Sequence, residues 1–474
     1  MLLYETIADG LRRQIAQGTL RAGERLPSVR QLAQAHQISA ATAVQACLQL
    51  EREGLVQARP RSGYFVHAAP SALPALPTLP TPRRRAPGEV ANPALQRLLE
   101  LPQRPGLFPL HAAVADHSLL PQASLSVALA RTTRRRPTAA LEYAPPQGDP
   151  ALRRQIALRY EQTGTPMQAD EVVVTAGATE ALSLALRVAT SPGDVVLVET
   201  PTYYGILQTV AALGLKVLEV PNRLGQGIDV ARLDRVLQQT AVRAAILVPN
   251  FSNPSGSLTC DADKQALLAS CARHGTVVIE DDVYGELAWS GQRPLPLRHW
   301  DTGGNVITCG SFSKTLAPGL RVGWLAGAAW TEALGRAKYF SSSSNASLPQ
   351  LAVGDYLARH GLERHLRRLR RAVADNGQRM RDAVARYWPA GTRCSAPAGG
   401  LSLWLQLPAG GDGLALFDAA LAAGIGISPG VLFSSRGDYG DCVRLSCGMP
   451  WDARLDQAMR QLGRLAARQT ASAR

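Results

Sequence analysis

The first 69 residues combine a helical hydrophobic pattern with two short alternating runs at their end. Residues 4–17 place apolar side chains at four-residue spacing with arginines outside, which predicts an amphipathic helix. Ser28 and Ser39 each stand where a serine can cap the N-terminus of a following helix. Two short strands are predicted at 55–59 and 63–66, around a turn. Three helices followed by a hairpin are the element order of a winged helix-turn-helix.

From residue 107 on, short apolar runs alternate with helical stretches. The runs are Val172–Val174, Val195–Val198, Ala245–Val248, Val277–Ile279 and Val306–Thr308. This alternation is typical of a parallel sheet covered by helices, which makes this part an α/β body. Ligands of such sheets bind beyond the carboxyl ends of the strands, where the polar motifs of this sequence lie.

A proline-rich segment separates these two parts. Six prolines and three consecutive arginines lie between Pro70 and Pro87, and a stretch of this composition cannot bury a core. We therefore predict a small N-terminal domain over residues 1–69, a semi-rigid spacer over 70–106 and the α/β body over 107–468. A chain of 474 residues is long enough for two or three domains.

Composition restricts the partners and the location. The net charge of +14 favours an anionic partner. No run approaches the roughly 18 apolar residues of a membrane helix, and the first 17 residues lack the apolar stretch of a signal peptide. The seven cysteines are scattered and never form a CxxC pair. We therefore expect reduced thiols, no metal site and a cytoplasmic protein.

Lys314 is the residue with the clearest chemical potential. The chain has 47 arginines and only four lysines, and Lys314 stands directly after the apolar run 305–309 in the segment 311–321, which also holds two serines and an arginine. An ε-amine can lose its proton and attack a carbonyl, whereas guanidinium stays charged at any working pH. The alternative is a solvated surface lysine. Small residues, hydroxyls and Arg321 around it favour a lysine that works beside a phosphate.

The N-terminal domain resembles the GntR family of bacterial transcription regulators, on the motifs LPSVRQLA, LEREGLV and RSGYFV and on Ser39 and Thr42. The resemblance implies that DNA is contacted by Arg30, Ser39, Thr42 and the wing residues Arg61 and Gly63. Serine, threonine and arginine near a helix start suit phosphates and base edges. Where many relatives carry a basic residue after the serine, this chain has alanines at 40 and 41, which leaves the helix little chemistry for base readout.

The body resembles fold-type I pyridoxal 5′-phosphate (PLP) enzymes of the class I/II aminotransferase type, with a small C-terminal α+β subdomain. The motifs are TAGATE at 175–180, ETPTYYG at 199–205, PNFSNPSG at 249–256, EDDVY at 280–284 and SFSKTLAPGLR at 311–321. The resemblance implies a covalent role for Lys314 and a set of cofactor contacts. These contacts are Ala178, Thr179, Ser311, Ser313 and Arg321 to the phosphate, Tyr203 stacked on the ring, Asn253 and Tyr284 to the phenolic oxygen, and Asp281 to the pyridine nitrogen.

Three further expectations follow from the same resemblance. The D-x-x-Y spacing selects Asp281 for the ring nitrogen, with Asp282 as the competing candidate. Arg444 would clamp the α-carboxylate of a substrate. Tyr143 would reach the phosphate of a neighbouring subunit, which implies a homodimer with shared active sites.

A GntR-type domain on an aminotransferase-like body is the architecture of the MocR subfamily. Its members are generally regulators that use PLP, sometimes with an amine ligand, to alter DNA binding. The first hypothesis is therefore a cofactor-dependent regulator that binds a double-stranded DNA operator and senses an amine or amino acid. The second is a working aminotransferase with an accessory DNA-binding domain. A third is a PLP-binding scaffold with neither activity.

Overall fold

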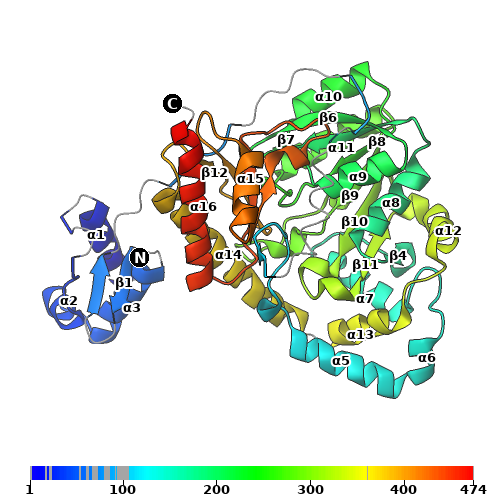
Figure 1. Cartoon of the computed structure of the whole chain (residues 1–474). Coiled ribbons are helices and arrows are strands. Elements are labelled where there is room, and N and C mark those ends of the chain that lie inside the picture. Colours follow the sequence, from blue (N-terminus) through cyan, green and yellow to red (C-terminus); the bar gives the residue numbers. More distant parts are fainter. Residues whose placement is uncertain are drawn as a thin grey trace. The chain divides into compact units, whose positions relative to one another are not determined.

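The computed structural model describes residues 3–16, 19–20, 24–52, 55–59, 63–66, 73–78, 86–90, 92, 106–359 and 361–472. It divides into two compact units, a winged-helix unit (Met1–Leu73) and a C-terminal unit (Pro74–Arg474) (Figure 1). The predicted boundaries at 69, 106 and 468 stay predictions.

The winged-helix unit has the predicted order of three helices and a hairpin. The elements are α1 (Leu3–Ala16), α2 (Val29–Ala35), α3 (Ala40–Arg52), β1 (Val56–Arg59) and β2 (Gly63–Val66). The two strands pair antiparallel, with Val56 opposite Val66. Ser28 caps α2 in a capping box with Gln31, which satisfies amide groups at the start of this short helix. Buried apolar residues of all three helices and both strands share one core.

The C-terminal unit is built on a mixed eight-stranded sheet. Its strands are β4 (Val172–Thr175), β5 (Val195–Thr200), β6 (Lys216–Arg223), β7 (Gly227–Ile228), β8 (Ala244–Leu247), β9 (Val277–Asp281), β10 (Val306–Ser311) and β11 (Gly323–Ala326). Their order is β4-β11-β10-β9-β8-β5-β6-β7. The five central strands from β10 to β6 run parallel. Four of them, β5, β8, β9 and β10, match runs that the sequence predicts, whereas β6 was missed. The remaining predicted run, Val172–Val174, lies in the edge strand β4.

The antiparallel strand β11 was missed in the sequence. It lies between β4 and β10 and is fully buried. Only residues 312–322 connect β10 to it, and they form two 3-10 turns, η6 (Phe312–Lys314) and η7 (Pro318–Leu320). A parallel crossover needs a dozen or more residues, so this short return brings the chain back antiparallel.

Helices cover both faces of the sheet. Successive residues of the strands alternate between two sets of core clusters, so that Val196 and Val198 pack with α8 and α9, whereas Leu197 packs with α10 and α11. The helices are α8 (Ala178–Ala189), α9 (Tyr204–Ala212), α10 (Val230–Gln239), α11 (Asp261–Arg273) and α12 (Thr331–Ser342). A third cluster adds α5 (Gln122–Arg135), α7 (Pro150–Glu161) and α13 (Ser347–Ala358) below β4 and β11. The short helix α6 (Pro137–Leu141) follows α5.

A smaller α+β subdomain completes the unit. Its sheet has the order β12 (Arg393–Cys394), β13 (Ser402–Gln406), β16 (Cys442–Ser446) and β15 (Ser428–Pro429). Its core holds residues of α14 (Leu362–Tyr387), α15 (Gly413–Ala422) and α16 (Ala453–Ser472). These helices lie beside one another in Figure 1. A two-stranded parallel pair, β3 (Phe108–Pro109) and β14 (Ile425–Gly426), joins the start of the body to it.

Part of the proline-rich segment lies on the surface of the C-terminal unit. Cys394 N donates to Ala75 O at 2.9 Å, and Gly88 and Val217 exchange two backbone hydrogen bonds. These described residues of the proline-rich segment are therefore bound to the C-terminal unit. Among the described residues, no helix combines the length and apolarity needed to cross a membrane.

Candidate cofactor site and DNA-contacting residues

Lys314 lies at the carboxyl end of β10, in the turn η6. Its Nζ donates to Ala113 O at 2.9 Å and lies 5.8 Å from the centre of the Tyr284 ring. Burial away from water and the nearby Arg444 together lower the pKa of Lys314 to about 8. A larger fraction of this lysine is therefore the neutral, nucleophilic amine at neutral pH than of an ordinary surface lysine.

Asp281 and Asp282 point to different surroundings at the end of β9. Asp281 is buried and accepts the Val283 N–H at 3.3 Å. Burial raises the pKa of Asp281 to about 7, and the neighbouring Asp282 adds to the rise. Lys314 acts in the opposite sense. A cationic or N–H partner next to this buried carboxylate would stabilise its charged form.

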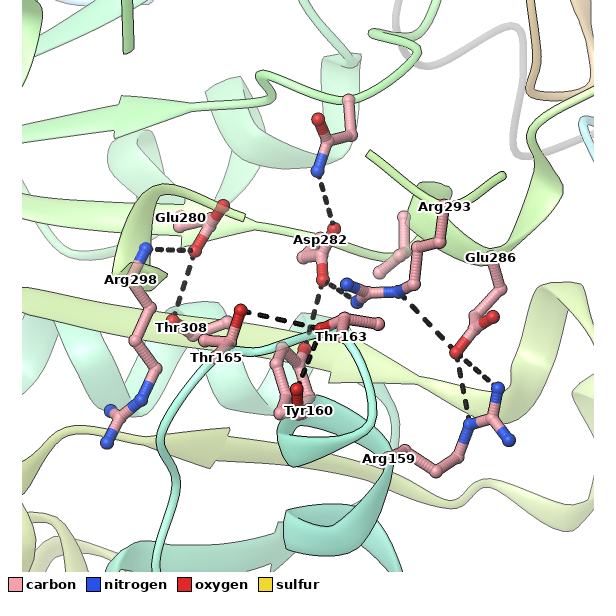
Figure 2. Close-up of polar contacts among 12 residues, drawn as sticks. Arg159, Tyr160, Thr163, Thr165, Glu280, Asp282, Glu286, Arg293, Arg298 and Thr308 are labelled. Atoms are coloured by element: carbon pink, nitrogen blue, oxygen red, sulfur yellow. Dashed lines mark hydrogen bonds and ion pairs between the residues drawn. The ribbon is translucent and has the colours of Figure 1, made fainter. Parts of the chain in front are cut away.

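Asp282 is already fully engaged (Figure 2). It accepts from Tyr160 Oη at 3.0 Å and Asn250 Nδ2 at 3.1 Å, and it pairs with Arg293. This engagement supports Asp281, and not its neighbour, as the partner of a ring nitrogen.

The network around Asp282 continues into a buried set of ion pairs. Arg293 also faces Glu286 at 3.5 Å, and Glu286 in turn binds Arg159 of α7 at 2.7 Å (Figure 2). Glu286 also binds Arg370 of α14 at 2.9 Å. These arginines lower the pKa of the Glu286 carboxyl against the effect of its burial. The end of β9 is thus tied by charge to α7 and to α14.

The turn after β10 and the start of α8 lie against each other at Arg321, whose Nη2 donates to Ala176 O at 2.6 Å. Ser313 N donates to Ser311 Oγ at 3.0 Å, and Arg321 Nη1 donates to Ser313 Oγ at 3.4 Å. Arg321 has a φ of 51°, a left-handed conformation that is uncommon outside glycine. Its guanidinium is so close to Gly177 that a Cβ there would lie 2.4 Å from Nη2.

Gly177 is the N-cap of α8, whose first residues are Ala178 and Thr179. The free amides at a helix start attract anions. The hydroxyls of Ser311 and Ser313 and the N-terminus of α8 therefore lie around Arg321. The sequence predicts these groups as the phosphate contacts.

A second cluster surrounds Arg444, which is 1% exposed. Its Nη1 lies 3.3 Å from Asn253 Oδ1, its Nη2 donates to Ser428 Oγ at 2.8 Å and to the backbone oxygen of His111, and its Cζ lies 5.5 Å from the Phe433 ring. Arg444 Nε is buried and has no hydrogen-bond partner among the described residues. A buried arginine with an unsatisfied N–H is suited to a carboxylate.

Asn253 also reaches Tyr284, since its Nδ2 lies 3.4 Å from Tyr284 Oη. Tyr203, at the end of β5, is half-buried, with its ring 4.6 Å from that of Tyr204. Burial raises the pKa of both Tyr203 and Tyr284, so both phenols stay protonated donors.

Several residues of this region were missed in the sequence. His111 supplies a backbone acceptor to Arg444, and burial together with that arginine lowers the pKa of its ring to about 4. Ala113 holds Lys314, and Phe433 lies against Arg444. These residues come from loops far apart in the chain and carry no motif, so only their placement identifies them.

The residues present fit PLP. A cradle with Arg321 suits a phosphate, Lys314 suits a carbonyl, and the buried Asp281 carboxyl suits a protonated ring nitrogen. No group of three His, Cys, Asp or Glu side chains that could hold a metal ion is found in the described parts of the chain. All seven cysteines are free thiols.

Two of the five predicted DNA contacts, Ser39 and Thr42, lie at the start of α3. Ser39 Oγ accepts the Thr42 N–H at 3.1 Å, so Ser39 caps α3 as predicted, and its Oγ also lies 2.8 Å from Thr42 Oγ1. Arg30 on α2 is exposed, and Gly63 begins β2 with a φ of 93°. Arg61 lies outside the described residues.

Tyr143 lies at the surface of the C-terminal unit. It is 91% exposed, and Leu141 of the preceding helix is 90% exposed. Two apolar side chains this open to water are unusual for a surface without a partner. Their exposure supports a role toward a second subunit.

Comparisons with known proteins match both units. The model of the bacterial regulatory proteins of the gntR family matches residues 3–66, and that of aminotransferase class I and II matches residues 119–462. The HTH-type transcriptional regulator YdcR of Escherichia coli is 38% identical over 465 residues, which are 98% of this chain and 99% of the relative. The 2-aminoadipate transaminase of Thermus thermophilus is 34% identical over 80% of this chain and 94% of its own.

A solved structure agrees with the fold of the C-terminal unit. LysN, the alpha-aminoadipate aminotransferase of Thermus thermophilus complexed with N-(5′-phosphopyridoxyl)-L-leucine, superposes with a TM-score of 0.74 at 31% identity. The match covers 81% of this chain and 97% of LysN.

Proposed function

Because this chain belongs to the GntR-type regulators of the MocR kind, which carry a class I/II aminotransferase domain, we propose that it binds DNA under the control of PLP and an amine or amino acid. The observation that carries the proposal is the presence in one chain of a complete winged helix and of an intact cofactor-type site. A catalyst alone has no need of the first, and a simple repressor has no need of the second.

Each group of the site has a role in this proposal. PLP supplies an electrophilic carbonyl and an electron-accepting ring when bound. Arg321, Ser311, Ser313 and the start of α8 would hold the phosphate, and Asp281 would keep a proton on the ring nitrogen. Lys314 would supply the amine that faces the carbonyl.

The ligand is proposed to be an amino acid because of Arg444. Arg444 offers a carboxylate a planar pair of donors in a buried site, where such a pair is strong. Asn253 and Tyr284 hold the ring oxygen from the side of Arg444. A homodimer with Tyr143 completing the partner's phosphate site accounts for the exposure of that tyrosine.

A second candidate is a working aminotransferase, favoured by the intact set Lys314, Asp281 and Arg444. In that case, amino-group transfer and not DNA binding is the main output. The alanines after Ser39 favour this candidate, because they leave the recognition helix with few groups that read bases.

The test is a DNA titration on the region upstream of the protein's own gene, with and without PLP and a panel of amines and amino acids. We expect at least one ligand to change the DNA dissociation constant by ~5–150-fold. Lys314→Ala should abolish this response, whereas the exposed Lys216→Ala should keep it. Indifference of DNA binding to every ligand, together with steady amino-group transfer in a half-reaction assay, would favour the enzyme.

A further inference from the structure

Residues 86–92, of which 86–90 and 92 are described, form a strap on the C-terminal unit. Gly88 N donates to Val217 O at 3.1 Å, and Val217 N donates to Gly88 O at 2.8 Å. This antiparallel bridge adds the strap to β6 at the edge of the large sheet. Val90 packs on the hydrophobic cluster beneath α8 and α9. The strap is therefore part of the folded body, and it leads along the chain toward the winged-helix unit.

The strap ends on the turn η9 (Gly430–Phe433), which follows β15. Asn92 Nδ2 donates to Val431 O at 2.5 Å and to Ser434 O at 3.0 Å. These two carbonyls stand on either side of Phe433, so one amide group holds both ends of the segment that carries this ring. Arg436, just beyond, donates to Ala86 O at 3.1 Å and makes a second bond between the same loop and the strap.

Phe433 is fully buried against the proposed carboxylate site. The centre of its ring lies 5.5 Å from the guanidinium carbon of Arg444 and 5.4 Å from the ring of Trp404. Its backbone oxygen accepts the Thr202 N–H at 2.9 Å, and Thr202 precedes the proposed stacking residue Tyr203. The position of Phe433 is thus shared by the carboxylate site and by the end of β5.

We propose that Asn92 is a positioning residue of the carboxylate site, and that through it the strap transmits ligand binding to the chain leading to the winged helix. Asn92 fixes the η9 turn, the turn fixes Phe433, and Phe433 supports the Arg444 guanidinium. A carboxylate that binds Arg444 favours the arrangement in which this turn is held. Ligand binding therefore strengthens the attachment of the strap, because the two events stabilise the same arrangement.

The inference rests on the proposed function, and it adds a structural connection from the carboxylate site to the chain that leads to the winged helix. Its test uses the full-length protein loaded with PLP and compares Asn92→Ala with Thr78→Ala. Thr78 is a matched control because it also belongs to the proline-rich segment and bonds to the body through its side chain, with its Oγ1 donating to Gln406 Oε1 on β13 at 3.1 Å. That bond is made to a different sheet from the one the strap extends. Arg436→Gln is a second strap variant.

The first readout is the cofactor absorbance during titration with an amino acid and with the corresponding amine that lacks the carboxylate. Removal of a buried hydrogen-bond donor leaves two carbonyls less satisfied, so we expect Asn92→Ala to bind the amino acid about tenfold more weakly. Affinity for the amine and the PLP content should stay at the wild-type value. Thr78→Ala should match the wild type for both ligands.

The second readout is hydrogen exchange of a peptide covering the strap, where the Gly88 amide reports the bond to Val217. In the wild type the amino acid should slow this exchange, and in Asn92→Ala and Arg436→Gln the slowing should be lost. The inference is overturned if Asn92→Ala binds the amino acid and the amine equally more weakly than the wild type does. It is also overturned if the amino acid leaves the hydrogen exchange of the strap unchanged in the wild type. If the wild type holds no PLP or responds to no ligand, the proposed function itself fails.

Discussion

At the scale of single residues, the contacts of a lysine indicate its role better than the small number of lysines in the chain does. Lys314 stands out in a chain with four lysines, yet Lys264 and Lys338 are also kept and are fully buried. Lys338 binds both carboxylate oxygens of Glu180 at 3.0 Å and Ser342 Oγ at 2.7 Å. By contrast, Lys314 has one hydrogen bond, to Ala113 O, among the described residues. Its ammonium is therefore free for chemistry, whereas the other two buried lysines are structural.

The two adjacent aspartates give a prediction that separates cofactor chemistry from stability. Asp281→Asn should weaken PLP binding and suppress the spectral response to amines, without lowering the free energy of unfolding. Asp282→Asn should lower the free energy of unfolding by about 3 kcal/mol, because Arg293 would be left as a poorly paired buried charge. The measurements are PLP titration and denaturant unfolding of both variants. Equal losses of PLP affinity would show that Asp281 was the wrong choice.

The same carboxyl predicts a pH dependence in the apoprotein. The pKa of Asp281 is raised from 3.8 to about 7, so the folded state retains a proton that the unfolded state releases. The stability that this proton provides is complete below about pH 4 and is lost as the pH rises to 7. Asp281→Asn should therefore make the apoprotein more stable at pH 8, by up to about 4 kcal/mol, and change little at pH 4. Urea unfolding at both pH values checks this, and a difference that is larger at pH 4 would contradict it.

At the scale of elements, the sequence could predict what is encoded locally. The capping serines, the hairpin and four of the five central strands follow from short patterns, and the structure has them. Strand β11 and the docking of the strap could not be predicted in this way. The first depends on the length of a return through η6 and η7. The second depends on contacts between residues far apart in the chain, such as that of the Asn92 amide with a turn more than 300 residues away.

The start of α3 gives a prediction at this scale, because Ser39 both caps the helix and is a predicted DNA contact. Two substitutions can separate these roles. Ser39→Ala should lower the stability of the winged-helix unit by ~1 kcal/mol through loss of the cap. Ser39→Asp should keep the cap, because aspartate is an equally good N-cap, but should weaken DNA binding about tenfold or more by charge repulsion.

Ser28→Asp is the matched control, because it changes the cap of α2 in the same way at a residue without a predicted DNA contact. Thermal unfolding and DNA titration in moderate salt are the measurements. DNA affinity that is unchanged in Ser39→Asp would remove Ser39 from the DNA-contacting set.

At the scale of the whole molecule, the two units and the proposed second subunit must act together. Within the C-terminal unit, the ion pairs of Asp282 and Glu286 (Figure 2) continue to Arg370 and so join the end of β9 to α14. The strap joins β6 to the turn beside Arg444. A ligand at Arg444 and Lys314 therefore contacts elements that reach both the small subdomain and the chain leading to the winged helix. The proposed shared site extends this connection across a dimer.

Mixed dimers test the sharing of sites directly. Each proposed site takes Lys314 from one subunit and Tyr143 from the other, so a dimer of one Lys314→Ala and one Tyr143→Ala subunit should collect both defects in one site. The other site should be intact. We therefore expect differently tagged mixed dimers to bind PLP with wild-type affinity at about half the wild-type capacity, because removing a phosphate donor weakens only the site that contains it.

The Tyr143→Ala homodimer is the control, and it should bind PLP about tenfold more weakly at both sites. If Tyr143 instead serves its own subunit, each site of the mixed dimer carries one defect and no site of wild-type affinity remains. Borohydride reduction at a PLP concentration that fills wild-type sites but not those of the Tyr143→Ala homodimer, followed by mass measurement of each tagged chain, distinguishes the two arrangements. With sharing, the Tyr143→Ala chain of the mixed dimer should be labelled as fully as a wild-type chain, because the partner's Tyr143 completes its site. Without sharing, it should be labelled as weakly as in the Tyr143→Ala homodimer.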